Sequence, residues 1–191
     1  MTSSIARLVA LIASAALLVG CSGDADSTES SSSASQPAGS PDAESAEAAG
    51  IDSTNPPKPV ATGTVPATIS EDPDATIDVE FFGLERQGKT LVATYSFTLQ
   101  ADGTGDKAYW LYDMLGDQGW HPTLVDTENL TLHRVLSGDA GRASFAYQGA
   151  KYHAGQTFYA YAFFAAPPAD VTTMSANVIE GMPTVTQVPV R

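Results

Sequence analysis

The stretch from Ile77 to Leu99 decides the fold, and it reads IDVEFFGLERQGKTLVATYSFTL. Apolar residues occupy every second position from Ile77 to Phe81 and again from Leu91 to Leu99. Successive side chains of a strand point to opposite faces, so this period of two predicts a pair of half-buried strands. Gly88 stands between them in a short polar segment, which predicts a hairpin turn.

Outward from this hairpin, five more segments have the composition of strands. They are 109–115, 120–125, 158–164, 171–179 and 185–190. The segment 158–164 is apolar on both faces, which favours a central strand over an edge strand. Seven or eight short strands separated by polar turns predict an all-β protein, an antiparallel β-sandwich of the immunoglobulin-like kind.

A further segment places three leucines on one face of a strand. Leu130, Leu132 and Leu136 stand opposite Thr131 and His133 in a period of two. The pattern predicts that His133 lies on the polar face of its strand, as a surface residue.

The folded domain is expected to span residues 66–191, because the chain before it has a different composition. Between residues 24 and 65 there are no aromatic residues, and small, polar and acidic residues dominate. Such a segment lacks the apolar surface that would offset its ordering entropy, so residues 21–65 are predicted to be a disordered acidic linker. The linker would act as a stalk for the domain. Its Ser and Thr residues leave open that the stalk bears glycans.

The first 20 residues are predicted to be a signal peptide. Arg7 precedes an unbroken run of apolar and small residues from Leu8 to Val19. A helix of this length rises about 18 Å, which is too short for the roughly 30 Å hydrocarbon core of a bilayer. A short apolar run behind a positive charge is typical of a secretory signal that is removed from the mature protein.

The end of this segment, Leu18-Val19-Gly20-Cys21, resembles the lipobox of bacterial lipoproteins. The resemblance implies cleavage between Gly20 and Cys21 and a diacylglyceryl group on the Cys21 sulfur. Two acyl chains give stable anchoring, whereas one chain binds only marginally. Membrane lipid is therefore an expected partner, and the expected location is the extracytoplasmic face of the cell membrane. The alternative is an ordinary signal peptide that happens to contain a cysteine.

The C-terminal part shares short segments with a known domain type. They are Gly155-Gln156 before a strand, FFAAPPADV at 163–171, VPV at 188–190 and VATYSFT at 92–98. In these segments the chain resembles an immunoglobulin-like envelope domain found in secreted proteins and lipoproteins of high-GC Gram-positive bacteria. The resemblance implies a fold and an envelope location, and it implies no activity.

Charge and cysteine content argue against several kinds of partner. The chain has 22 acidic and 9 basic residues, which gives a net charge of −13. Nucleic acid and anionic lipid surfaces both require basic residues for binding, so neither is an expected partner. The single cysteine permits no intrachain disulfide and no cysteine-built zinc site.

Motifs of catalysis and metal binding are missing from the sequence. It contains no G-x-S-x-G, P-loop, G-x-G-x-x-G or H-E-x-x-H. A serine hydrolase would have to use His133, Asp139 and Ser144, which no motif places together. The three histidines lack the spacing of metal ligands, and the acidic segments 71–74 and 102–106 lack the ligand set of an EF-hand. We therefore expect no catalytic site, no metal and no cofactor.

Aromatic residues offer one candidate binding surface. Trp110 and Tyr112 would share one side of a strand, and Trp120 follows closely. Tryptophan and tyrosine anchor protein interfaces and also stack on sugar rings, so Trp110, Tyr112 and Trp120 are the candidate residues. A buried tryptophan is also usual in an immunoglobulin-like core, so Trp110 or Trp120 is expected to be a core residue instead.

Together these features predict a lipid-anchored, non-enzymatic binding or accessory protein of the cell envelope, with an envelope protein as its partner. The alternative is a module that binds cell-wall glycan. An exposed aromatic row would favour glycan, and an open edge strand or an apolar patch would favour a protein. A cleft with converging titratable groups would indicate an enzyme.

Overall fold

The computed structural model describes residues 41–138, 141–142, 144–145 and 151–191. They belong to one compact unit, Pro37–Arg191. The predicted signal peptide, Gly20, Cys21 and the first half of the predicted linker lie outside the described residues. No helix in the described part of the chain is long and apolar enough to span a membrane.

The described unit is almost entirely β-structure. Its elements are α1 (Pro41–Ala48), β1 (Ala61–Pro66), β2 (Thr76–Gln87), β3 (Thr90–Gln100), α2 (Leu111–Met114), β4 (Thr123–Asp126), β5 (Thr131–Arg134), β6 (Ser137–Gly138), β7 (Gly141–Arg142), β8 (Ser144–Phe145), β9 (Thr157–Ala165), β10 (Thr173–Asn177) and β11 (Val185–Pro189).

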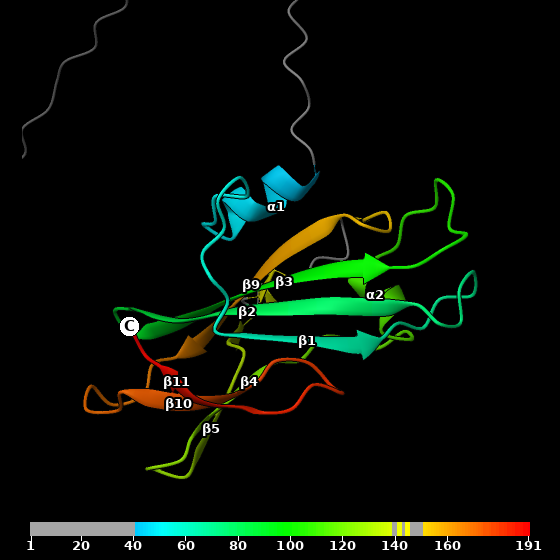
Figure 1. Ribbon diagram of the computed structural model, residues 1–191. Coiled ribbons are helices and arrows are strands. Elements are labelled where there is room, and N and C mark those ends of the chain that lie inside the picture. The colour runs from blue at the N-terminus through cyan, green and yellow to red at the C-terminus, as the bar shows by residue number, and fades with distance from the viewer. Residues whose placement is uncertain (1–40, 139–140, 143, 146–150) are drawn as a thin grey trace, which may run out of the picture. The chain divides into compact units, whose positions relative to one another are not determined.

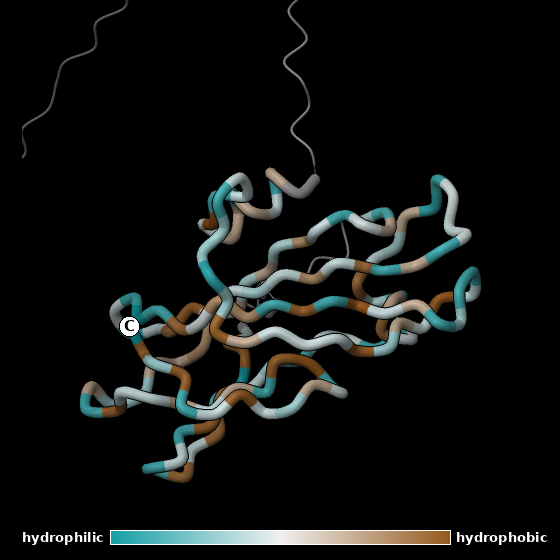
Figure 2. The backbone as a smooth tube through the Cα atoms, in the orientation of Figure 1, coloured by the Kyte–Doolittle hydropathy of each residue, from teal (hydrophilic) through white to brown (hydrophobic). Residues whose placement is uncertain are grey.

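The strands form two main antiparallel sheets (Figure 1). The larger sheet has the order β1-β2-β3-β9-β8, the smaller has the order β11-β10-β4-β5, and β6 and β7 form a separate pair. One cluster of buried apolar residues joins both sheets, and apolar segments run along strands of each sheet in Figure 2. The predicted all-β, antiparallel sandwich is therefore confirmed.

The predicted hairpin forms the centre of the larger sheet. β2 and β3 pair from Thr76–Gln100 to Gln87–Thr90, and Gly88 in the turn has φ 62°, a conformation that glycine adopts without steric cost. A register shift after Phe81 breaks the alternation of side chains. Leu84 therefore lies in the core with Phe81, although the two are three residues apart. Phe82 points to the opposite side and belongs to a separate cluster.

The ordered domain begins before the predicted boundary at residue 66, so the prediction of a disordered linker is wrong for residues 41–65. Helix α1 packs Ala46 against Phe82 and Tyr159 of the larger sheet. The Ser45 hydroxyl accepts a hydrogen bond of 3.1 Å from the Tyr159 N–H. β1 pairs with β2 through main-chain groups, and this pairing needs few apolar side chains. A composition average over the whole segment conceals both elements.

Residues 109–115 do not form the predicted strand. Tyr109 makes an isolated bridge to Tyr152, and the chain then enters the one-turn helix α2. Leu111 and Met114 of this helix are buried, and residues three apart lie on one side of a helix. The apolar positions thus fit a helical turn as well as a strand, and in the folded protein they form the helix.

The remaining predicted strands are present but shorter or shifted. β4 begins three residues after the predicted start at Trp120, and β10 and β11 lie inside their predicted segments. β9 covers the predicted segment 158–164, and it lies between β3 and β8.

The pairing of β5 reverses the predicted orientation of its side chains. Leu124 of β4 is fully buried, and its partner across the pair is His133, which therefore points to the inner side. The His133 Nδ1 lies 2.8 Å from the Ala165 carbonyl oxygen. Leu132 pairs with Val125 on the outer side. The prediction that His133 lies on the polar face is wrong, because a strand's facing depends on the strand it pairs with.

Candidate functional site

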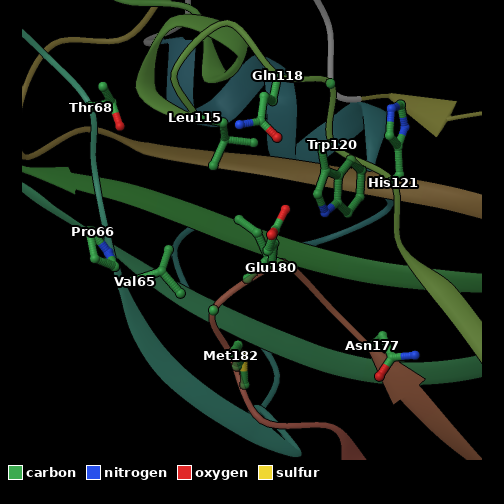
Figure 3. Close-up of a pocket in the computed structure, with 13 residues that line it drawn as sticks. Val65, Pro66, Thr68, Leu115, Gln118, Trp120, His121, Asn177, Glu180 and Met182 are labelled. Carbon is green, nitrogen blue, oxygen red and sulfur yellow. The ribbon is translucent and has the colours of Figure 1, made fainter.

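A cleft opens where three segments far apart in the sequence meet. The end of β1, the loop between α2 and β4, and the loop between β10 and β11 enclose about 670 Å³, a volume in the range of small-molecule sites. Figure 3 shows the side chains of Gln118, Trp120 and Glu180 turned toward the middle of this space. The lining residues are Val65, Pro66, Thr68, Leu115, Gln118, Gly119, Trp120, His121, Asn177, Ile179, Glu180, Gly181 and Met182.

Trp120 forms a fixed wall of the cleft. Its indole N–H donates a hydrogen bond of 2.8 Å to the Val178 carbonyl oxygen. Its ring lies at nearly right angles to Tyr95 and Phe97, with ring centroids 4.8 and 5.3 Å away. The prediction that one of the two tryptophans is a core residue is confirmed for Trp120, which is 7% exposed. A ring buried in this way offers no open platform for a sugar.

The loop between β10 and β11 is held against β1 in a defined shape. A Cβ atom on Gly63 would lie 3.0 Å from the Met182 Cγ, so Met182 reaches the β1 backbone because position 63 has no side chain. Gly181 has φ 89°, and the Met182 N–H donates to the Ile179 carbonyl oxygen at 3.2 Å. The mouth of the cleft is therefore preformed on this side.

The lining is close to neutral in charge. Glu180 is its only carboxylate, and it includes no lysine or arginine. The Asn177 side chain is engaged, because it donates to Thr123 at 3.1 Å and accepts from Thr184 at 2.6 Å. In Figure 3 the ring of His121 turns away from Glu180, so these two titratable groups do not converge. The cleft can receive a neutral or cationic group, and its described residues supply no acid–base pair.

The three aromatic residues singled out in the sequence do not form one exposed row. Trp110 is partly buried, and the Lys151 ammonium lies 4.0 Å from its ring centroid. Tyr112 of α2 is 38% exposed, whereas Trp120 belongs to the core. Trp110 and Tyr112 thus remain near the surface without Trp120.

The acidic segments considered for calcium lie beside each other but bond within the protein. Asp72 accepts hydrogen bonds from the Asp74 N–H at 3.0 Å and from the Asp102 N–H at 2.8 Å. Among the described residues, no group of three or more His, Cys, Asp or Glu side chains is placed to hold a metal ion. Asp139, which the hydrolase alternative needs, lies outside the described residues.

Glu71 connects the start of the larger sheet to the loop after β3. It accepts hydrogen bonds from the Lys107 ammonium and from the Tyr109 hydroxyl, the latter at 2.9 Å. The bonds from Lys107 and Tyr109 lower the pKa of Glu71 to about 2. Loss of hydration together with this carboxylate raises the pKa of Tyr109 to about 12.

The outer face of the smaller sheet is a second candidate site, which we call the bare face. Its four strands contain two charged residues, Asp126 and Arg134. Asp126 is fully buried, so Arg134 is the only charged side chain that this face presents. The other outward residues of β4, β5 and β10 are Thr123, Val125, Leu132, Thr173, Ser175 and Asn177.

β5 is an edge strand of the bare face, and exposed leucines lie within it and on either side of it. Leu130 is 89% exposed, Leu132 is 50% exposed and Leu136 is 36% exposed. The hairpin of β4 and β5 lies at the lower end of Figure 1 and contains apolar stretches in Figure 2. An edge strand with apolar side chains is a template for pairing with another chain.

The turn that presents these leucines is fixed by Asp126. Its Oδ1 accepts hydrogen bonds from the N–H groups of Glu128 and Asn129, both at 3.0 Å, and its Oδ2 accepts one from the Asn129 side chain at 2.8 Å. These bonds, led by that of the Asn129 side chain, lower the pKa of Asp126. Leu130 follows with φ 53°, a left-handed conformation that is unusual for leucine.

Sequence reasoning missed the cleft apart from Trp120, and it missed the bare face. The cleft had no local signal, because its walls come from three distant segments. The bare face did have one: strand segments almost free of charge within a chain of net charge −13.

No protein family matches this chain, and no curated protein matches its sequence. Among solved structures, the chain is similar to MPT63, a secreted protein from Mycobacterium tuberculosis whose crystal structure is known at 1.5 Å resolution. The two are 14% identical, the match covers 67% of this chain and 91% of MPT63, and the TM-score is 0.41.

Proposed function

We propose that this protein is a lipid-anchored binding module of the bacterial cell envelope, held outside the cytoplasmic membrane by acyl chains on Cys21. The lipobox-like sequence Leu18–Cys21 and the short apolar run before it support the anchor. The displayed domain begins at α1 in this proposal, because the second half of the predicted linker folds onto the sandwich as α1 and β1.

The binding role is directed at another protein, and the bare face with its open edge β5 is the observation that carries this proposal. Exposed leucines at a strand edge favour pairing with a polypeptide, whose main chain can extend the sheet. The face carries no acidic side chain, although the chain has a net charge of −13. A partner can therefore approach here without meeting the repulsion that the rest of the surface produces.

The alternative of a glycan-binding module receives less support. It requires aromatic rings that are open to solvent and arranged in a row. Trp120 is buried against Tyr95 and Phe97, and Trp110 lies beneath Lys151. The role is also non-enzymatic in this proposal, because the titratable groups of the cleft do not converge.

The anchor is tested by replacing its only thiol. We expect Cys21→Ser to abolish lipid attachment, so that the protein no longer enters the detergent phase on phase partitioning of cell extracts. A variant that partitions with detergent as the wild type does would refute the anchor. This result would leave the binding role unaffected.

The binding role is tested by cross-linking in intact cells. A photo-reactive amino acid is placed at Leu132 of the full-length protein, and in a control at Thr186, an exposed position on β11 at the opposite edge of the same sheet. We expect protein adducts from position 132 and none, or far fewer, from position 186. Absence of adducts from position 132 would refute a protein partner on this edge.

A further inference from the structure

The surface that we assign to a protein partner also indicates which protein fits it. We propose that the partner is a second copy of this chain, and that two β5 strands pair antiparallel to form one continuous sheet across a two-fold axis. This inference rests on the proposed function and names the partner of the same edge.

Charge complementarity supports a second copy. On the described hairpin from Asp126 to Ser137, the only exposed charged residues are Glu128, just before β5, and Arg134, at its end. Antiparallel pairing of two identical strands places the start of one beside the end of the other. Glu128 of each copy then lies near Arg134 of the other copy, so two opposite-charge pairs form by symmetry.

The apolar residues obey the same symmetry. Leu132 and Arg134 face outward together, because residues an even number apart share a face of a strand. Glu128 lies in the turn before β5, which Asp126 holds by accepting hydrogen bonds from the Glu128 and Asn129 N–H groups. When two β5 strands pair antiparallel with Leu132 opposite Leu132, Arg134 lies opposite Leu130 of the other copy, next to the turn that contains Glu128. The two Leu132 side chains therefore cover each other.

The rest of the protein supports this choice of face. With a net charge of −13, two copies repel each other over most approaches. The bare face presents Arg134 and no carboxylate, so it is the side on which two copies can come close. β5 has only four residues, and a contact of this size suits a weak association that needs the high local density of anchored copies.

The first test is the mass of the adducts formed from a photo-reactive amino acid at Leu132. We expect the main adduct to have twice the mass of the mature chain and to contain only peptides of this protein. Adducts with other proteins alone would overturn the inference while leaving the proposed function intact. Absence of any adduct would overturn both.

The second test uses the symmetry of the charges. Glu128→Arg or Arg134→Glu places like charges at both ends of the pair, and we expect either variant to lower the yield of the double-mass adduct by about fivefold. The double variant Glu128→Arg, Arg134→Glu restores opposite pairs, so its yield should return close to that of the wild type. Co-expression of the two single variants should also restore it, in mixed pairs.

These residues are exposed, so the substitutions leave the core untouched, and unchanged melting temperatures will confirm that each variant is folded. A double variant that remains as weak as the single variants would overturn the two-fold arrangement.

Discussion

The two sheets of this sandwich differ in how their outer faces are finished. On the larger sheet, the carboxylate of Glu80 accepts a hydrogen bond from Ser96, and that of Asp78 accepts one from Gln100, each at 2.9 Å. Helix α1 covers the aromatic pair Phe82 and Tyr159 of the same sheet. The bare face of the smaller sheet has no such covering helix among the described residues, and its edge leucines are exposed.

The difference also extends to the strand edges. The β9 edge is occupied by β8 and, at Tyr159, by the Ser45 hydroxyl of α1, whereas the β5 edge has no further strand in the described part of the chain. Proteins protect edges that would otherwise pair with other chains. The β9 edge is thus closed by β8 and by α1, whereas the β5 edge is open in the described part of the chain and carries exposed leucines, and this contrast is the reason for placing the partner on β5.

Trp120 packs in the core between the two sheets, so removing its side chain should have the largest effect on the stability of the domain. We expect Trp120→Ala to lower the free energy of unfolding by about 3–5 kcal/mol, because it leaves a cavity between Tyr95 and Phe97. Urea unfolding of the variant measures this. The control is Trp110→Ala, which removes a partly exposed ring outside the main core cluster and should cost far less. Equal losses from the two variants would contradict the core assignment.

The closed edge can be opened by a smaller change. Ser45→Ala removes the acceptor for the buried Tyr159 N–H, which should weaken the docking of α1 by about 1–3 kcal/mol. We expect faster hydrogen exchange at the Tyr159 amide and faster proteolysis between residues 49 and 60, with little change in global stability. Glu47→Ala, an exposed change on the same helix, is the control. Unchanged exchange at Tyr159 would show that α1 is not needed to close this edge.

Acidification should destabilise each sheet through a different carboxylate, Asp126 in the smaller sheet and Glu71 beside the larger one. Asp126 has a pKa below its ordinary value of 3.8, so its contribution to stability is complete above that value and is lost as the pH falls through the lower, folded pKa. The contribution of Glu71 to stability is complete above its ordinary pKa of 4.5 and is lost as the pH falls through its folded pKa of about 2.

We expect acidification below pH 4 to broaden or shift the amide signals of the β4–β5 hairpin, followed by NMR. Asp126→Asn should lessen this pH dependence and leave that of Glu71 in place. A hairpin whose signals respond identically in both proteins would exclude Asp126 as the cause.

How far the sequence predicts this structure depends on whether the signal is local. The hairpin of β2 and β3 was predicted because its period of two and its turn lie within one continuous segment. Helix α1 was not, because it depends on docking Ala46 and Ser45 onto a sheet that already exists. Its own sequence has almost no amphipathic pattern.

The site shows the same limit. The orientation of Leu132 and His133 could not be obtained from β5 alone, since either face can be the inner one until Leu124 of β4 sets the register. Trp110 and Trp120 are chemically alike, and only packing against Tyr95 and Phe97 separates them.

The smallest effect is expected at the open edge, and it is the sharpest measure of the contrast between the two faces. Leu132→Thr places a β-branched, uncharged side chain that suits a strand on the bare face, so we expect the free energy of unfolding to change by less than about 0.5 kcal/mol. Leu124→Ala, on the inner side of the neighbouring strand, should cost about 2–5 kcal/mol. Urea unfolding of the two variants compares a leucine on the inner face of the sheet with one on the outer face.

If Leu132→Thr lowered the free energy of unfolding as much as Leu124→Ala does, Leu132 would be a structural residue, and its exposure would no longer argue for a partner. If its cost is near zero while cross-linking from a photo-reactive amino acid at the neighbouring exposed Leu130 declines, the Leu132 side chain acts in contact with another chain and has no part in holding this one together.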